Sequence, residues 1–271
     1  MKALEYASDI TLPDQRVAVC GDWHGNVGWA RTLARAIPTL ASDVTTILQL
    51  GDWWIDPEVV DEVFAGTSIS RILVTLGNHE PWDRVTPLLE AHPGSAVRVS
   101  EVTWLLPRPA RLTIGGRTVL SLGGAASVDR LWRIDGADWW RDETITDVHV
   151  AEASAGGPAD LMLTHESPAN SPVRAVREVL RVNPMGFPDE TLAESKESRG
   201  RVRQVWDAVH PELLMHGHMH VAGGGVTRDG RRVASFGRDS QEGSLAFLDL
   251  RTLRLDTPSI RQIRERAVPD A

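Results

Sequence analysis

The chain has 271 residues, of which 42% are hydrophobic, and a formal net charge of −8 at pH 7. This length and composition suit one large α/β domain with a full core, so we expect residues 1–271 to form a single domain. Because the charge is acidic and no basic run occurs, we expect no binding to the backbone of nucleic acids.

The cysteine content and the N-terminus exclude further classes of protein. Cys20 is the single cysteine, so an intrachain disulfide and a cysteine-based zinc site are both excluded. It ends an apolar run, and we expect a buried, unreactive thiol. The first nine residues include Glu5 and Asp9 and do not resemble a secretory signal. No run of 18 apolar residues occurs, so we expect a soluble, cytoplasmic protein that does not enter a membrane.

The first part of the chain alternates between strand-like and helix-like patterns. Apolar runs predict three strands, and apolar residues at helical spacing predict a helix after each of them. The expected strands are 16–20, 45–50 and 71–76, and the expected helices are 25–36, 56–64 and 83–91. This β-α-β-α-β-α order predicts right-handed crossovers and a partly parallel sheet.

Short strand candidates are common in the rest of the chain. They are 97–99, 103–106, 111–114, 117–122, 160–164 and 213–216, followed by 221–226, 232–236 and 245–250, which we expect to alternate as antiparallel strands. Gly115-Gly116 and Asp229-Gly230 predict tight turns between strands. Residues 166–200 contain four prolines and are the least regular stretch, interpreted as a lid or a variable loop. A helix is expected at 201–209, and a short helix or a frayed end after 258.

Five short segments end in side chains that commonly bind metals, and a strand-like run precedes nearly every one. They are Gly21-Asp22-Trp23-His24-Gly25-Asn26, Gly51-Asp52, Gly77-Asn78-His79-Glu80, Thr164-His165 and Gly217-His218-Met219-His220. Single Asp-x-His or His-x-His matches arise often by chance, but five segments in series at strand ends are a strong signal. Together they supply enough ligands for two adjacent metal ions, and such a pair of ions can hydrolyse a phosphate ester.

The spacing within these segments suggests which side chains act together. Residues two apart in an extended segment point the same way, so Asp22 and His24 are expected to hold one metal together. His218 and His220 share this spacing. Asp52 ends the second expected strand, where its carboxylate is placed to bridge two ions.

The segment around Asn78 combines two roles. Asn78 offers a neutral carbonyl oxygen as a ligand. His79 is its neighbour in the chain and should point elsewhere, so it is a poor ligand but is placed to face a substrate.

Each candidate ligand also has a purely structural interpretation. Taken singly, Asp22 is a candidate helix cap, Asn78 a turn residue and His165 a hydrogen-bonded core histidine. Taken jointly, these interpretations require five coincidences at strand ends, and we set them aside. We keep the structural interpretation for three histidines outside any such segment, which are His92, His149 and His210.

The series of segments resembles the pattern of the calcineurin-like metallophosphoesterase superfamily, which is D-x-H, G-D, G-N-H-[DE], H and G-H-x-H. The resemblance spans Asp22 to His220, most of the chain. It implies a four-layer α/β/β/α sandwich with two mixed β-sheets, and a metal-ligand core at 16–250 within the single domain.

The resemblance also implies a ligand set for two metal ions. The first ion would be held by Asp22, His24, Asp52 and His220. The second ion would be held by Asp52, Asn78, His165 and His218, with Asp52 as the bridge. The histidine that matches His79 would donate a proton to the leaving group.

The motifs do not place the chain in one branch of that superfamily. Residues 21–25 and 77–80 are similar to the serine/threonine phosphatases and bis-nucleoside tetraphosphatases. That branch also carries G-D-x-V-D-R-G, whereas residues 51–57 read Gly-Asp-Trp-Trp-Ile-Asp-Pro and lack the arginine. Residues 217–220 look instead like the small bacterial and phage phosphodiesterases.

The pattern therefore predicts a hydrolase, a dinuclear metal-dependent phosphoesterase. Its partner would be a small phosphorylated substrate, a mono- or diester, with a nucleotide among the candidates. Two divalent ions about 3.5–4 Å apart would share a hydroxide that attacks phosphorus, and His79 would protonate the leaving oxygen. The mixture of oxygen and imidazole ligands favours manganese, with iron or zinc as alternatives. The rival interpretations are a non-catalytic metal-binding scaffold of the same fold and a nuclease, and the complete ligand set and the acidic charge count against them.

Arginine and tryptophan residues near the expected strand ends are candidates for substrate contact. Arg84, Arg130 and Arg133 are candidate clamps on a phosphate, with surface solvation as the alternative. Several of the ten tryptophans lie near a ligand or in the loop after 124, and these are Trp23, Trp53, Trp54, Trp82, Trp139 and Trp140. They suggest either a stacking surface for an aromatic group or a hydrophobic shell that fixes the ligands, and we favour the shell.

Overall fold

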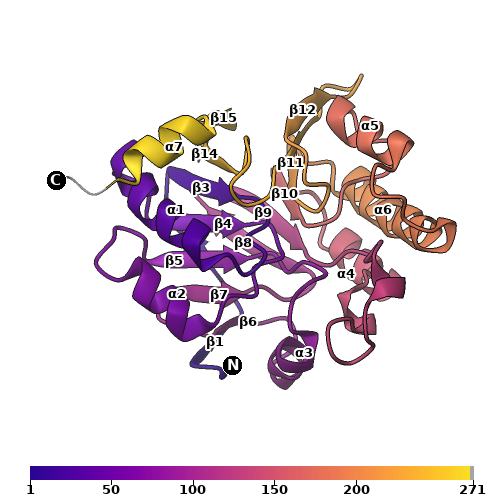
Figure 1. The fold of residues 1–271 in the computed structure, drawn as a ribbon, viewed down its shortest axis with the longest axis horizontal. Helices are drawn as coiled ribbons and strands as arrows, with labels where there is room; N and C mark the ends of the chain where they lie inside the picture. The colour runs from indigo at the N-terminus through magenta and orange to yellow at the C-terminus, as the bar shows by residue number, and fades with distance from the viewer. Residues whose placement is uncertain (269–271) are drawn as a thin grey trace.

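The computed structural model describes residues 1–268, which form two mixed β-sheets with helices on the outer face of each (Figure 1). The two sheets pack against each other through a shared apolar layer. This arrangement confirms the predicted four-layer α/β/β/α sandwich.

The first sheet has eight strands and is built around the predicted β-α-β-α-β-α unit. Its order is β1 (Glu5–Ala7), β6 (Ala96–Arg98), β7 (Thr103–Leu105), β5 (Arg71–Val74), β4 (Thr46–Gln49), β3 (Arg16–Cys20), β14 (Leu245–Asp249) and β15 (Arg254–Asp256). The strands β3, β4, β5 and β7 run parallel, and the remaining pairings are antiparallel. Parallel strands end at the same edge of the sheet, which brings the segments after β3, β4 and β5 together.

The second sheet has seven strands and is also mixed. Its order is β12 (Gly223–Val226), β13 (Arg232–Ser235), β11 (Leu213–His216), β10 (Leu161–Thr164), β9 (Arg117–Leu122), β8 (Ala110–Ile114) and β2 (Thr11–Leu12). The strands β9, β10, β11 and β13 run parallel. The hairpin turn at Gly115-Gly116 joins β8 to β9, as predicted, and both glycines have a positive φ.

The expectation that the last three strands alternate as antiparallel neighbours is wrong in two places. Strand β13 pairs parallel with β11, and β14 belongs to the first sheet, where it pairs with β3. Only β12 and β13 form the predicted hairpin. The cause is side-chain size. Strand β12 is mostly glycine and is exposed, whereas Val233 and Ser235 of β13 are buried. The strand with buried side chains lies inside the sheet, and the glycine strand forms its edge.

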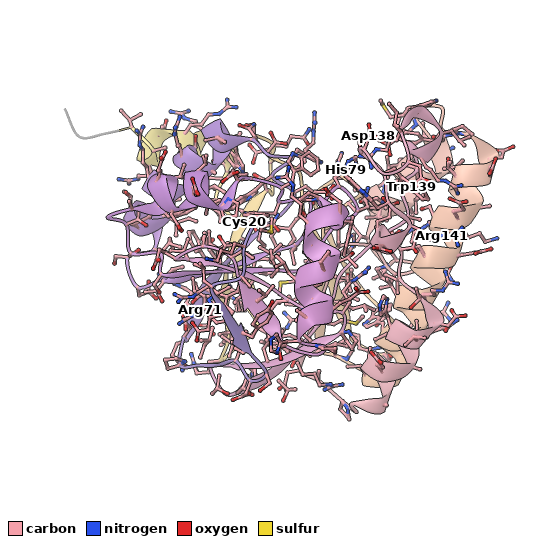
Figure 2. The ribbon with its side chains drawn as sticks, turned by 90° about the horizontal axis from the view of Figure 1, so that it is seen from below. Cys20, Arg71, His79, Asp138, Trp139 and Arg141 are labelled. Atoms are coloured by element: carbon pink, nitrogen blue, oxygen red, sulfur yellow. The ribbon has the colours of Figure 1, made fainter. Side chains whose placement is uncertain are left out.

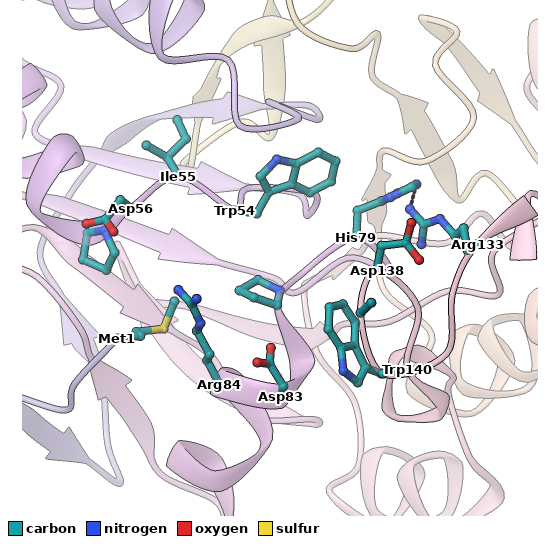
Figure 3. A pocket seen from close by; sticks show the side chains of 14 residues that line it. Met1, Trp54, Ile55, Asp56, His79, Asp83, Arg84, Arg133, Asp138 and Trp140 are labelled. Atoms are coloured by element: carbon teal, nitrogen blue, oxygen red, sulfur yellow. Dashed lines mark hydrogen bonds between the residues drawn. The ribbon is translucent and has the colours of Figure 1, made fainter.

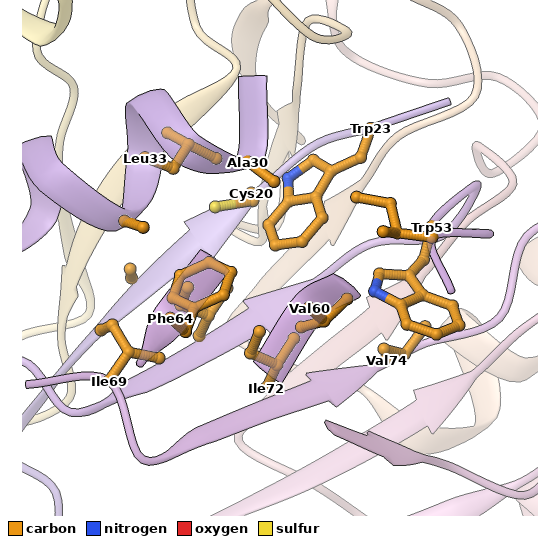
Figure 4. Close-up of a cluster of buried hydrophobic side chains, with 14 of the residues drawn as sticks. Cys20, Trp23, Ala30, Leu33, Trp53, Val60, Phe64, Ile69, Ile72 and Val74 are labelled. Carbon is orange, nitrogen blue, oxygen red and sulfur yellow. The ribbon is translucent and has the colours of Figure 1, made fainter. Parts of the chain in front are cut away.

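Alternation along the strands assigns side chains to layers. In β3, Val17 and Val19 face the second sheet, whereas Ala18 and Cys20 face the helices. Figure 4 shows the helix-side layer, in which Trp23 and Trp53 pack with aliphatic side chains. Cys20 is buried there, as predicted, and burial raises the pKa of its thiol, which keeps the thiol protonated.

Helices cover the outer face of each sheet (Figure 1). The helices next to the first sheet are α1 (Val27–Leu40), α2 (Pro57–Phe64), α3 (Trp82–Ala91) and α7 (Ile260–Arg266). Those next to the second sheet are α4 (Asp147–Ala155), α5 (Arg174–Val182) and α6 (Asp189–Val209), with the short helices η1 (Arg130–Trp132) and η2 (Arg141–Glu143) in the loop after β9. Asn26 caps α1 by accepting a hydrogen bond from the Trp29 amide, so the cap is not Asp22. None of the helices in residues 1–268 is long and apolar enough to cross a membrane.

The segment 166–200, predicted to be irregular, is largely helical and forms α5 and most of α6. Its prolines flank the helices, and Pro188 directly precedes α6. The buried face of α6 contains Thr191, Ser195 and Ser198 in place of apolar residues. The hydrophobic periodicity that would have predicted this helix is therefore absent from its first three turns.

Candidate metal centre

The five predicted segments meet at one edge of the sandwich. Each follows the carboxyl end of a parallel strand, namely β3, β4 and β5 in the first sheet and β10 and β11 in the second. In Figure 2, His79, which follows β5, lies near the top of the view, and Arg71, where β5 begins, lies lower down on the left. Because the sheets pack face to face, their strand ends bring side chains from both sheets to one place.

Four of the predicted ligands form a compact group at this edge. The ligand atoms of Asp22, His24, Asp52 and His220 all lie within 4.8 Å of one another. The Nε2 of His220 is 3.1 Å from Asp22 Oδ2, and the Nε2 of His24 is 3.6 Å from Asp52 Oδ2. Atoms that share a metal ion at about 2.0–2.2 Å are about 3–4 Å apart, so this group has the dimensions of a metal site.

The remaining predicted ligands lie directly beside this group. The Nε2 of His165 is 3.0 Å from Asn78 Oδ1 and 3.3 Å from Asp52 Oδ1. The ring of His218 lies beside that of His165, with 5.0 Å between the centroids and 59° between the ring planes. Asp52 therefore directs one oxygen towards His24 and the other towards His165, the arrangement expected of a bridging carboxylate.

The backbone at these ligands is bent rather than extended, which corrects the reasoning from residue spacing. His24, Asp52, His218 and His220 have φ values of 48°, 54°, 61° and 52°. Non-glycine residues rarely adopt such angles, and they cluster at functional sites where the surroundings hold them. Gly217 has a different role, because a Cβ at that position would lie 2.1 Å from Asp22 Oδ1.

The carboxylates and histidines of this group shift each other's pKa values. Burial alone would raise the pKa of Asp52, but the charges of His165, His24 and His218 and a hydrogen bond from His165 lower it to about 2. Burial lowers the pKa of His165, but the carboxylates of Asp52 and Asp22 outweigh this effect and raise it to about 10. The two buried carboxylates thus require positive charge beside them, and a divalent cation would supply it.

An unpartnered atom supports the same conclusion. Asp52 is 1% exposed, and its Oδ2 has no hydrogen-bond partner among residues 1–268. A buried charged oxygen without a partner is costly, and a metal ion would satisfy it. Asp22, His24, Asp52 and His220 therefore fit a divalent cation, and Asn78, His165 and His218 lie beside them.

Side chains that were not predicted hold the ligands in place. Asp239 Oδ1 lies 3.1 Å from the Nδ1 of His24, which directs the Nε2 of His24 towards Asp22 and Asp52. The same carboxylate accepts a hydrogen bond from Asn26 Nδ2 at 2.6 Å. Asp239 lies in the loop after β13, a parallel strand, so the strand-end rule could have identified it.

Glu80 joins the loops that carry Asp52 and Asn78. Its buried carboxylate accepts hydrogen bonds from the amides of Gly77, Trp53 and Trp54 at 3.0–3.1 Å. Burial and the charge of Asp52 raise the pKa of Glu80. The acidic residue that follows His79 in the sequence is therefore a support for the loops rather than a ligand.

His79 lies next to the ligand group, and its ring centroid is 6.3 Å from that of His24. Its backbone amide donates to Asp52 Oδ1 at 2.9 Å, while its ring lies 5.1 Å from that of Trp54. The Nε2 of His79 is 3.0 Å from an Nη atom of Arg133. A guanidinium can only donate, so Nε2 accepts in this arrangement and carries no proton.

Comparisons with known proteins agree with this geometry. A sequence model of calcineurin-like phosphoesterases matches residues 15–222, which include all seven predicted ligands. The chain belongs to this family. A comparison with curated proteins gives no match.

Solved structures with the same fold are distant in sequence. The protein TT1561 of Thermus thermophilus is similar with a TM-score of 0.55 at 12% identity, covering 91% of this chain and 99% of that one. A dimetal phosphatase from Danio rerio gives a TM-score of 0.53 at 11% identity, covering 88% and 93%. At these identities the likeness concerns the fold alone.

Beyond His79, this member of the family has a pocket of about 580 Å³ (Figure 3). Trp54 and Trp140 lie on opposite sides of it. The charged residues that line the pocket are Asp56, Asp83, Arg84, Arg133 and Asp138. None of the three carboxylates forms an ion pair within residues 1–268, and neither does Arg84. Asp56 accepts a hydrogen bond from the Glu58 amide, and Asp138 accepts one from the Ile134 amide.

The three candidate arginines differ in position. Arg133 contacts His79 and forms an ion pair with Asp129 at 3.1 Å. Arg84 lines the outer part of the pocket, away from His79. Arg130 forms an ion pair with Glu194 of α6 and covers the ring of Trp139, so the structure brings it to neither His79 nor the pocket lining.

The tryptophans divide into two groups. Trp23, Trp53 and Trp82 are at most 1% exposed and belong to the core, which agrees with the favoured interpretation. Trp54 and Trp140 are half-buried and line the pocket, so for these two the stacking interpretation fits.

The three histidines assigned structural roles have such positions. His92 stacks on Tyr6, and His210 follows the last residue of α6 in a left-handed conformation. His149 completes a capping box with Thr146 at the start of α4.

Proposed function

We propose that the chain is a dinuclear metal-dependent phosphoesterase that hydrolyses a small organic phosphate ester. The observation that carries this proposal is the convergence of seven metal-binding side chains with His79 and an adjoining pocket at one edge of the sandwich. When bound, two divalent ions would supply the positive charge that activates water and holds the phosphoryl oxygens. The ligand chemistry favours manganese, with iron or zinc as alternatives.

The residues of this chain have separate roles in the proposed reaction. Asp22, His24 and His220 would hold the first ion, and Asp52 would hold both. A second set, made of Asn78, His165 and His218, would hold the other ion. The left-handed backbone at four of these residues aims their side chains before any ligand arrives, which reduces the reorganisation that binding requires.

His79 is the proposed donor of a proton to the leaving oxygen. The contact with Arg133 leaves no proton on Nε2, so the acid role requires Arg133 to move off this atom. A phosphate oxygen is a suitable new partner, because a guanidinium binds phosphate in a bidentate geometry. Arg133 would then change from a partner of His79 to a clamp on the substrate.

The pocket beyond His79 is the proposed site for the alcohol part of the ester. Trp54 and Trp140 offer flat apolar surfaces on its two sides. The pocket lining carries three carboxylates, Asp56, Asp83 and Asp138, against two arginines, Arg84 and Arg133, so an alcohol that carried further phosphate groups would meet a net negative charge. We therefore propose an uncharged, ring-bearing alcohol, and a nucleoside is one that fits this description.

A panel of esters tests this proposal. The purified, manganese-loaded protein would be assayed on a nucleoside monophosphate, a bis-aryl phosphate diester, a sugar phosphate and a bis-nucleoside polyphosphate. We expect turnover of at least one of the first three esters and a much lower kcat/KM on the polyphosphate. No turnover of any ester by a protein with two ions bound would favour the scaffold interpretation.

A further inference from the structure

The side chain of Ser127 connects the metal ligand Asn78 with Arg133. Its Oγ accepts a hydrogen bond from Asn78 Nδ2 at 2.9 Å and another from Arg133 Nη1 at 3.3 Å. The hydroxyl itself donates to Glu143 Oε2 at 2.9 Å, and the Ser127 amide donates to Glu143 Oε1 at 2.8 Å. Asn78, Ser127 and Glu143 are each at most 2% exposed, so water does not replace these bonds.

The direction of the Ser127 hydroxyl determines the orientation of the Asn78 amide. A hydroxyl has one hydrogen and two lone pairs, and here Glu143 takes the hydrogen. Both lone pairs then face donors, which are Asn78 Nδ2 and Arg133 Nη1. The Nδ2 of Asn78 is thus fixed on Ser127, and its Oδ1 must point towards His165 and the second metal position.

We propose that Glu143, acting through Ser127, is a positioning residue that keeps the Asn78 oxygen aimed at the second metal and Arg133 beside His79. This inference rests on the proposed function, since it concerns the same centre. Neither residue touches a reacting atom. Their effect is to fix one metal ligand and the group that contacts the proposed acid.

Only a carboxylate can serve both donors of Ser127. The amide and the hydroxyl each need an acceptor, and a carboxylate offers two oxygens whereas a glutamine offers one. A glutamine at position 143 would direct its NH₂ group at the Ser127 amide or at the hydroxyl oxygen. In the second case the Ser127 hydroxyl would turn its hydrogen towards Asn78. The Asn78 amide would then have to turn its NH₂ group towards the metal.

The surroundings of Glu143 show that it is held in place for this contact. Its backbone carbonyl accepts from the Ala125 amide and from Arg108, whose guanidinium covers the ring of Trp82 at 4.2 Å. Burial raises the pKa of Glu143 to about 7, against the lowering effect of its hydrogen bonds from Ser127. A purely structural position would be occupied at less cost by a neutral side chain.

Measuring metal binding at pH 8 in a set of matched variants tests this proposal. The variants are Glu143→Gln, Ser127→Ala and Glu143→Asp, with Asp142→Asn as control. Asp142 is the neighbour of Glu143 but accepts a hydrogen bond from Thr86 instead. The readouts are the metal ions bound per chain, the manganese dissociation constant of each ion, kcat and KM on an aryl ester, and the melting temperature of the metal-free protein.

For Glu143→Gln and Ser127→Ala we expect one of the two manganese dissociation constants, that of the ion which Asn78 would hold, to rise about 10–100-fold, the usual cost of removing an outer partner of a ligand. The other dissociation constant should be unaffected, and kcat should fall at saturating metal. Glu143→Asp keeps both acceptor oxygens and should recover part of the loss. The control Asp142→Asn should bind both ions as the wild type does.

Two outcomes would overturn the proposal. One is wild-type affinity for both ions in Ser127→Ala and Glu143→Gln. The other is equal weakening of both ions together with a large fall in the melting temperature of the metal-free protein, which would indicate a structural role. If Glu143→Gln does not fold, Ser127→Ala gives the same test, because Asn78 Nδ2 loses its acceptor. Ion binding is measured without a substrate, so a protein that hydrolyses no ester would still decide this inference.

Discussion

The ligand group and the pocket beside His79 lie next to each other but are built in opposite ways. The ligands follow strand ends of both sheets, and Asp22, Asp52, Asn78 and His165 are almost completely buried. The pocket is lined by the segments 54–57, 79–84 and 133–140 together with Met1, and Asp56, Asp83, Arg84 and Asp138 are exposed. One region is fixed by the strand ends, and the other is formed mainly by loops, together with the first turn of α3.

In the proposed function, this difference separates the metal chemistry from the choice of substrate. A side chain at the end of a buried strand is held in place by the sheet. Metal ions need such fixed side chains, because their ligands must be placed to a fraction of an ångström. Loops tolerate substitution more readily, and specificity is commonly located there. Substitutions in the ligand group should therefore affect all esters alike, whereas those in the pocket should affect one ester more than another.

The largest expected effect is at the bridging carboxylate. Asp52→Asn should lose both ions and reduce turnover on every ester by more than the roughly 10–100-fold that removal of an outer partner costs. Asp22→Asn should affect mainly the first ion. Elemental analysis of both variants measures the ions per chain. If Asp52→Asn retains both ions at normal occupancy, the bridging assignment is wrong.

The next effect concerns His79, which lies at the boundary between the two regions. His79→Ala should keep its metals and lose about 10²–10⁴-fold in rate, the usual contribution of general acid catalysis. The loss should be large for alkyl esters and small for nitrophenyl esters, because nitrophenolate leaves without a proton. Rates on both ester types, together with metal content, provide the check. An equal loss on both types would remove His79 from the acid role.

A smaller effect is expected at Asp239, which supports the ligand group from outside. Asp239→Asn should weaken binding of the first ion by about 10–100-fold, because His24 loses the carboxylate that orients its ring. Titration with manganese measures this change, with Asp256→Asn, exposed on β15, as a control. Unchanged affinity would show that the backbone alone orients His24.

The smallest effect is expected in the pocket. Trp140→Ala should raise KM for an aromatic or nucleoside ester by about fivefold, which is the lower end of stacking energies at about 1 kcal/mol. An alkyl ester without a ring should show little change, and kcat should be nearly constant for both. Trp132→Ala is a matched control, since Trp132 belongs to the same loop but is 60% exposed and does not line the pocket. A similar change in KM for both esters would contradict the stacking role.

The sequence predicted which segments meet at one edge of the sandwich, because strand ends leave a clear pattern. The runs before Asp22, Asp52 and Asn78 are strands that end within four residues of each ligand. Parallel pairing then requires these ends to meet at one edge. Asp239 and Ser127 also follow strand ends, those of β13 and β9. Neither residue lies in a recognisable sequence motif.

The parts that the sequence did not predict lack such a pattern. The first turns of α6 bury serine and threonine, so the apolar periodicity of a helix is missing. The role of Glu143 depends on a contact with Ser127 across 16 residues of a loop. The relation between Arg133 and His79 is likewise a contact between distant segments, and spacing alone could suggest only that Arg133 is near the site.

The most direct test of the proposed function is a metal titration monitored by activity. The protein would be freed of metal by chelation, verified by elemental analysis, and then supplied with manganese while hydrolysis of an aryl phosphate ester is followed. We predict no activity in the metal-free protein, and a rate that rises with manganese and levels off at two ions per chain. Full activity in verified metal-free protein would contradict the proposed metal-dependent mechanism.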